Sequence, residues 1–156
     1  MRVRTQLRLV AALVAAPLIP SLTGCNRAPL DAPIPPPSMV FGEDMCDECS
    51  MIISEQRYAG AIGLRNGRRI KHLLFDDIGE MFLYELPPHD DMRYFVHDLE
   101  SAECLGADEA HFLRSKKLRT PMGTGVAAFA KPEERDAALA RLGGEALTLA
   151  TLRSGG

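Results

Sequence analysis

The chain has 156 residues, of which 46% are hydrophobic and 25% are charged, and its formal net charge is −3. A chain of this length can bury one ordinary hydrophobic core, or two small lobes that share one. The negative net charge argues against nucleic acid as a partner.

The first 24 residues predict a secretory signal. Three arginines among residues 1–8 precede an apolar run, Leu9–Ile19, which is too short to span a bilayer. The run leads to Leu22-Thr23-Gly24-Cys25, which resembles the lipobox of bacterial lipoproteins. This resemblance implies that residues 1–24 are removed and that Cys25 carries a lipid anchor on the periplasmic side of a bacterial membrane. Loss of the three arginines changes the formal charge from −3 to −3 − 3 = −6.

Residues 25–40 are expected to form the anchor and a linker. Five prolines between residues 29 and 37 favour an extended conformation and offer little to bury. The folded domain is therefore expected to comprise residues 41–156.

Within this domain the pattern predicts an α+β fold of small mixed sheets with helices. The pair Asn66-Gly67 is a strong hairpin signal, Asp77 begins a helix in a capping-box-like sequence, and Pro132 opens a helix that stops at Gly143. No repeat of fixed sequence period is present. In chain order we expect strands at 58–64 and 68–75, a helix at 77–86, a strand at 93–97, a helix at 108–115, a strand at 125–130, a helix at 131–142 and a closing strand at 146–152.

Three cysteines remain once Cys25 is assigned to the anchor, and an odd number argues against a fully paired disulfide scaffold. Two of them form the motif Cys46-x-x-Cys49. A redox motif needs a stabilised thiolate, whereas the acidic residues around this pair raise a thiol pKa. A structural zinc site needs four ligands, and the sequence has no second pair of Cys or His at similar spacing.

A site for a soft metal ion fits this segment better. Cys46, Cys49 and Met51 place two thiols and a thioether within six residues, a donor set that suits Cu(I). Met51 lies on the same face of an extended backbone as Cys49, although core packing is the alternative for this residue. Met122 lies in the loop Thr-Pro-Met-Gly-Thr-Gly and is a second thioether candidate, unless it fills a gap in the core. The sequence does not choose among the four histidines as further ligands.

Three blocks in this order resemble the NosL family: Cys46–Ile53, Phe75–Met81 and Thr120–Phe129. NosL proteins are lipoproteins associated with assembly of the copper centre of nitrous oxide reductase. The resemblance implies a Cu(I)-binding metallochaperone without catalytic turnover, built on two ββαβ units.

The resemblance also bears on single residues. It supports Cys49 and Met51, which match the family's Cys-x-Met element, and it extends to Met122. Ser50 stands where many members carry glycine. Cys104 matches no family motif and is expected to be a core residue or a bystander.

The expected partners are a copper-dependent client enzyme, which the family implies to be nitrous oxide reductase, a membrane transporter, and the lipid membrane through Cys25. The alternative is a periplasmic thiol oxidoreductase or an organomercurial-lyase-like enzyme that uses Cys46 and Cys49. Such an enzyme needs a cysteine of low pKa. A third hypothesis is a structural lipoprotein with a Cys46–Cys49 disulfide.

Overall fold

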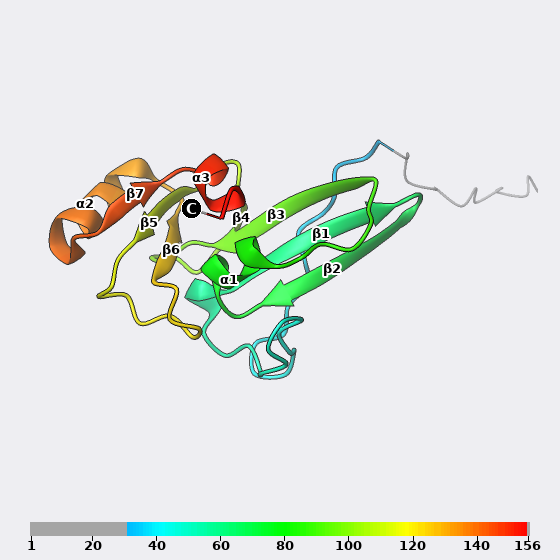
Figure 1. Cartoon of the computed structure of the whole chain (residues 1–156), viewed down its shortest axis with the longest axis horizontal. Helices are drawn as coiled ribbons and strands as arrows, with labels where there is room; N and C mark the ends of the chain where they lie inside the picture. The colour runs from blue at the N-terminus through cyan, green and yellow to red at the C-terminus, as the bar shows by residue number, and fades with distance from the viewer. Residues whose placement is uncertain (1–30, 156) are drawn as a thin grey trace, which may run out of the picture.

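Seven strands form two antiparallel sheets in the computed structural model, which describes residues 31–155 (Figure 1). The first sheet has the strand order β2-β1-β3-β4 and the second the order β6-β5-β7. The strands are β1 (Gly60–Asn66), β2 (Arg69–Phe75), β3 (Asp91–His97), β4 (Cys104–Gly106), β5 (His111–Arg114), β6 (Val126–Phe129) and β7 (Glu145–Leu147). The helices are the short 3-10 turn η1 (Gln56–Tyr58), α1 (Ile78–Leu83), α2 (Pro132–Leu142) and α3 (Leu149–Arg153).

The two sheets repeat one topology. In β1–β2–α1–β3 and in β5–β6–α2–β7, the first strand lies at the centre, between its hairpin partner and the strand that follows the helix. The α+β prediction and the two ββαβ units are therefore confirmed. Every pairing between two of these strands is antiparallel, so the expectation of mixed sheets is wrong.

Local signals located several elements correctly. Asn66 pairs with Arg69, so the predicted hairpin forms and its two loop residues are Gly67 and Arg68. Helix α2 has Pro132 in its first turn and ends at Gly143, as expected. Helix α1 begins after Asp77 but ends at Leu83, three residues before the predicted end.

Three predictions in the second half need correction. The helix expected at 108–115 is instead strand β5, because this segment pairs with both β6 and β7 and buries Phe112 and Leu113. The closing strand expected at 146–152 is split into β7 and α3, with Thr148 as the N-cap of that helix. Strand β4 was not predicted, since its three residues carry too short a pattern.

The first sheet buries both faces. Side chains alternate along each strand, so Ile62, Phe75 and Val96 face α1 and the main core. The opposite face carries Ala61 and Phe95, which form a smaller cluster. No described helix is long and apolar enough to cross a membrane.

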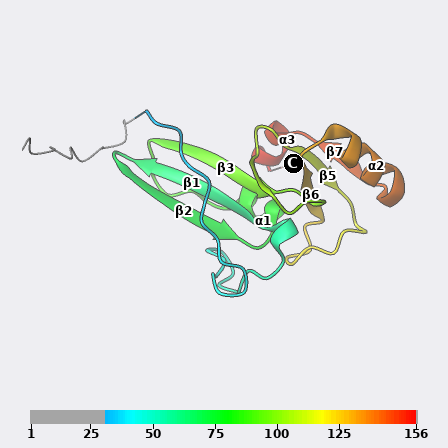
Figure 2. The ribbon, with the colours of Figure 1, turned by 180° about the vertical axis from the view of Figure 1, so that it is seen from behind.

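The N-terminal segment covers that second face (Figure 2). Ile34 is 3% exposed and packs on Ala61 and Phe95, and a Cβ at Gly63 would lie 2.5 Å from its side chain. Glycine at this position therefore lets the segment approach the sheet. The prediction that the linker buries little is wrong at Ile34.

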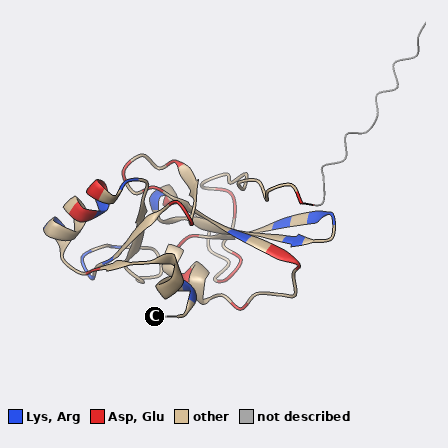
Figure 3. Cartoon of the chain, turned by 90° about the horizontal axis from the view of Figure 1, so that it is seen from above, with Lys and Arg blue, Asp and Glu red and all other residues tan. Residues whose placement is uncertain are grey.

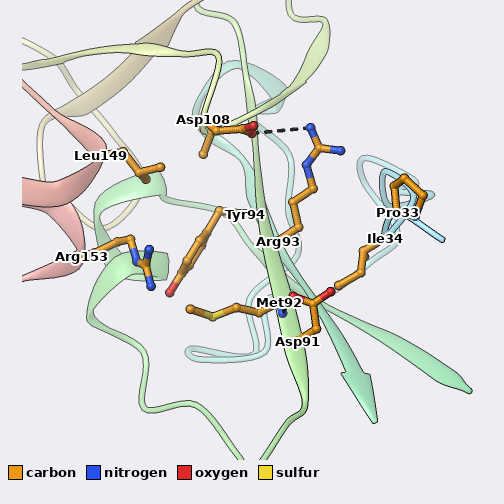
Figure 4. A pocket seen from close by; sticks show the side chains of 10 residues that line it. Pro33, Ile34, Asp91, Met92, Arg93, Tyr94, Asp108, Leu149 and Arg153 are labelled. Carbon is orange, nitrogen blue, oxygen red and sulfur yellow. Dashed lines mark hydrogen bonds and ion pairs between the residues drawn. The ribbon is translucent and has the colours of Figure 1, made fainter. Parts of the chain in front are cut away.

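The same segment helps to line a cavity of about 530 Å³ beside β3 (Figure 4). Pro33 and Ile34 form one wall, and α3 contributes Arg153, whose guanidinium lies 5.8 Å from the ring centre of Tyr94. The cavity carries charges of both signs: Arg93 pairs with Asp108 at 3.5 Å (Figure 4), and Asp91 pairs with Arg65 outside the cavity at 3.8 Å. It is a structural junction between the linker, the first sheet and the C-terminal helix.

Candidate metal centre

A short loop before η1 carries both cysteines of the Cys-x-x-Cys motif. Met45 and Ile52 form an isolated antiparallel bridge, and inside it the Cys46 N–H donates to the Met51 carbonyl at 2.8 Å. Ser50 closes the turn by donating its N–H to the Cys46 carbonyl at 2.9 Å, with φ at +60°. This left-handed conformation favours glycine, and here serine adopts it.

Asp47 attaches this loop to the exposed edge of the first sheet. Its N–H donates to the Leu74 carbonyl at 2.7 Å, and its carboxylate accepts the Leu74 N–H at 2.8 Å. Lys71 on the same strand lies 3.8 Å from the Asp47 carboxylate. Both backbone groups of Leu74 on this edge are thereby satisfied, and the cysteines are held beside the end of β2.

The other half of the site comes from the connection between β2 and α1. Asp76 follows the last residue of β2, and Glu80 lies in the first turn of α1. The spacing of four residues places their carboxylates on the same side of the helix start. Both side chains thus face the cysteine loop.

Two thiols and two carboxylates meet at this point. One potential ligand atom from each of Cys46, Cys49, Asp76 and Glu80 lies within 4.8 Å of the others. The Cys46 thiol donates to Glu80 Oε2 at 3.6 Å, and Cys49 Sγ lies 3.9 Å from both Asp76 carboxylate oxygens. Cys46 is buried and Cys49 is partly exposed, so the centre opens to solvent on the Cys49 side.

Burial controls the protonation of this cluster. It raises the pKa of the Cys46 thiol to about 12, so this residue is a neutral thiol near pH 7. Burial and, to a smaller extent, the nearby Asp76 carboxylate also raise the pKa of Glu80. Cys46 therefore keeps its proton until a ligand that stabilises the thiolate displaces it.

Asp77 connects the cysteine half of the protein to the loop that carries Met122. It is fully buried, caps α1 by accepting the Gly79 N–H at 2.9 Å, and accepts the Thr120 hydroxyl at 2.6 Å and the Met122 N–H at 3.0 Å. The Thr124 hydroxyl also donates to this carboxylate. One side chain thus fixes the Met122 loop against the start of α1, next to Asp76.

Close approach of that loop requires a glycine on α1. A Cβ at Gly79 would lie 2.5 Å from the Thr124 Cβ and closer still to its hydroxyl oxygen. The Phe-Asp-Asp-Ile-Gly sequence therefore serves two purposes: it supplies a carboxylate to the cluster and it accepts the loop of the second unit.

The residues expected to bind metal fall into two groups. Cys46 and Cys49 come together, whereas Met51 and Met122 lie on the flanking segments with exposed fractions of 48% and 41%. The assignment of these four residues as ligands stays a prediction. Cys25, the expected lipidation site, lies outside the described residues.

Sequence reasoning missed Asp76 and Glu80 as members of the cluster. Their spacing of four residues across a strand–helix junction was the available signal, but Asp77 and Glu80 together suggested only a helix cap. No histidine belongs to the group of Cys, His, Asp and Glu that the described region brings together. His97, for example, is buried with its Nδ1 3.0 Å from the Ala59 carbonyl oxygen, and Cys104 is a free, exposed thiol on β4.

These features define a class of small α+β protein with two ββαβ units and a thiol–carboxylate cluster. The family model for NosL matches residues 37–154, which is 118 of 156 residues, and the chain therefore belongs to the NosL family. Comparison with curated proteins gives no match.

A solved structure shares the fold. It is the crystal structure of the copper chaperone NosL from Shewanella denitrificans, with a TM-score of 0.59 and 16% sequence identity. The match covers 76% of this chain and 95% of that chain. At this identity the likeness shows that the two proteins have the same architecture.

Proposed function

We propose that this protein is a lipid-anchored Cu(I) metallochaperone that delivers copper to an extracytoplasmic copper enzyme, with nitrous oxide reductase as the client. The observation that carries the proposal is the pair of free thiols, Cys46 and Cys49, in one partly open cluster. Thiolates are soft donors and select Cu(I) over harder ions. Membership of the NosL family and the shared architecture with a copper chaperone support the same function.

In this proposal Cys46 and Cys49 provide the thiolates, and the exposed thioethers of Met51 and Met122 provide further soft donors. Asp76 and Glu80 contact the two sulfur atoms and hold them in place. A partly exposed ligand such as Cys49 lets an incoming thiolate or thioether of the partner replace the outgoing one. Such a site favours transfer over storage.

The pKa of Cys46 argues against the enzymatic alternative. A thiol oxidoreductase or an organomercurial-lyase-like enzyme needs a thiolate near neutral pH, which positive neighbours or a helix N-terminus provide. Here burial raises the pKa of Cys46 to about 12, and the nearest charged groups are carboxylates. These groups suit a carrier that makes no catalytic turnover.

The proposal is tested by anaerobic titration of the purified protein with Cu(I) in competition with a chelator. We expect binding of about one Cu(I) per chain, with sulfur as the main neighbour in X-ray absorption spectra. Cys46→Ser/Cys49→Ser should remove tight binding, whereas Cys104→Ser, a change at an exposed free thiol elsewhere, should leave it intact. Tight binding by the double variant, or coordination by oxygen and nitrogen alone, contradicts the proposal.

The lipid anchor has its own test. Mass spectrometry of the protein isolated from membranes should show a diacylated and N-acylated Cys25 as the first residue, and Cys25→Ala should release the protein into the periplasmic fraction. Intact residues 1–24 in the membrane form would contradict it.

A further inference from the structure

We infer that the connection between β5 and β6 is the surface on which the copper acceptor docks, and that the acceptor presents an acidic face to it. The inference rests on the proposed function, because it names the partner surface of the same metal centre. We call Lys116, Lys117 and Arg119 the basic strip.

The basic strip is a local excess of positive charge on an acidic protein. All three side chains are exposed, and within the part of the chain that the structure describes none of them forms an ion pair. Arg114 just before the strip is different, since it pairs with Glu145 at 3.4 Å. The strip thus offers three uncompensated charges on a chain whose formal net charge is −3.

The surface around the strip is hollowed. Two cavities of about 440 and 420 Å³ open on either side of this connection, and Lys116 and Ser115 line both of them. Arg119 lines the first cavity and Lys117 the second. A partner can therefore bring carboxylate side chains into recesses that carry positive charge, which gives more specificity than a flat charged surface.

The strip is continuous with the metal centre. Arg119 precedes Thr120, whose hydroxyl donates to Asp77, and Met122 two residues further on donates its N–H to the same carboxylate. Asp77 directly follows Asp76 of the thiol–carboxylate cluster. An acceptor that docks on the strip consequently lies against the exposed Met122 and next to the opening of the centre.

The charges on the opposite flank of the centre have the other sign. The cysteine loop carries four acids between residues 43 and 48, and Asp76 and Glu80 lie behind it. An acidic partner face is attracted to the basic strip and repelled by the cysteine loop. The two flanks together fix the orientation in which the acceptor approaches.

The position of the N-terminal segment argues for a protein and against the membrane as the occupant. Arg65 near the tip of the β1–β2 hairpin donates to the Ala32 carbonyl, which holds the start of the described chain at that tip. Cys25 is 31 − 25 = 6 residues from Asp31, a distance of at most about 22 Å in a fully extended chain. The membrane to which the proposed lipid on Cys25 anchors the protein therefore lies at the hairpin end of the molecule.

The metal centre and the basic strip both lie away from the hairpin tip. Asp76 follows the end of β2 that pairs with Gly60, whereas the hairpin tip is at Asn66, six residues or about 20 Å along β1. Figure 3 shows the blue segments of the hairpin tip and of the β5–β6 connection at opposite ends of the long axis. The strip consequently faces the aqueous compartment, where it meets soluble partners.

The test measures copper transfer from the full lipoprotein, purified in detergent and loaded with Cu(I). The acceptors are copper-free nitrous oxide reductase, a disulfonated and therefore anionic Cu(I) chelator, and the uncharged parent of that chelator. The variant is Lys116→Glu/Lys117→Glu. The matched control is Arg68→Glu/Arg69→Glu, a pair of exposed neighbouring cations at the hairpin tip.

For the parent protein we expect transfer to the enzyme and to the anionic chelator to slow as salt rises from about 20 to about 500 mM. The Lys116→Glu/Lys117→Glu variant should bind the same amount of Cu(I) but transfer it at least about ten-fold more slowly to the enzyme and to the anionic chelator at low salt. Transfer to the uncharged chelator, and all transfer from the control variant, should stay within about two-fold of the parent.

Equal transfer rates for variant and parent, or an equal loss in the control, would overturn the inference. The inference would also be overturned if the strip controlled binding to phosphatidylglycerol vesicles but had no effect on the transfer rates. If copper passes to the anionic chelator in a manner that depends on the strip but never to nitrous oxide reductase, the surface stands and the client is another acidic protein. A parent protein that takes up no Cu(I) at the loading step would refute the proposed function itself, before any transfer is measured.

Discussion

Replacement of Asp77 should destabilise the protein more than any other single carboxylate change near the centre. Its buried carboxylate accepts from Gly79, Thr120, Met122 and Thr124, so it joins the two ββαβ units as well as capping α1. A hydrogen bond to a charged acceptor contributes about 1.5–3 kcal/mol, but the loop donors can be partly rehydrated when the acceptor is lost. We therefore expect Asp77→Ala to lower the free energy of unfolding by about 3–5 kcal/mol.

This prediction is checked by urea denaturation followed by circular dichroism. With a slope of about 1.5 kcal/mol per molar urea, the midpoint should fall by about 2–3 M. Asp77→Asn keeps the size and a capping oxygen and should lose about half as much. In the control Asp90→Ala, a single exposed acceptor of the Gly67 N–H at 2.6 Å is removed, and the loss should stay below about 1 kcal/mol. An Asp77→Ala variant as stable as the control would refute the proposed link between the units.

Three further changes test other parts of the structure. Gly79→Ala should destabilise by about 1–2 kcal/mol in the same denaturation assay, since the overpacking against the β5–β6 connection exceeds the gain in helix propensity. Burial lowers the pKa of His97, so only the unfolded chain binds a proton as the pH first falls below 6.5; stability should therefore decrease below this pH in the parent and less in His97→Gln. Cys46 should be the last of the described cysteines to react with iodoacetamide at about pH 8, because burial raises its pKa to about 12; mass spectrometry of the peptides would contradict this if Cys46 reacts before the exposed Cys104.

The parts of the fold that local sequence decides could be predicted. The hairpin turn, the proline in the first turn of α2 and the glycine at its end each act within a few residues. Strand β5 could not be found in this way, because its neighbours are β6 and β7, which lie more than ten residues away along the chain. Acids followed by apolar residues at 108–115 suit a short helix locally, and pairing on both edges overrides that preference.

The residues of the candidate centre also fall into those that the sequence identifies and those that only tertiary contacts bring together. The sulfur donors are rare residue types in one short segment, so composition identifies Cys46 and Cys49. Asp76 and Glu80 are common residue types, and they enter the cluster only because Asp47 fastens the cysteine loop to the edge of β2. That attachment is a tertiary contact without a sequence signature.

The two ββαβ units have the same topology but different residues between the second strand and the helix, so they distinguish residues that the fold requires from residues that only the metal centre requires. β2 ends at Phe75 and β6 ends at Phe129, and in both units two residues follow before the helix begins. The first unit has Asp76-Asp77 in this connection, and the second has Ala130-Lys131. The strand–helix connection can therefore form without either carboxylate.

This comparison predicts opposite outcomes for two neighbouring aspartates. Asp77 forms hydrogen bonds to the second unit. The buried Asp76 side chain makes a weak contact to Cys49 Sγ at 3.9 Å, and its counterpart in the second unit, Ala130, has no carboxylate. We expect Asp76→Ala to change the free energy of unfolding by less than about 1 kcal/mol while it weakens retention of Cu(I), measured by competition with a chelator. A loss of stability as large as that of Asp77→Ala, with Cu(I) retention unchanged, would show that Asp76 belongs to the fold and that the metal centre is formed by sulfur alone.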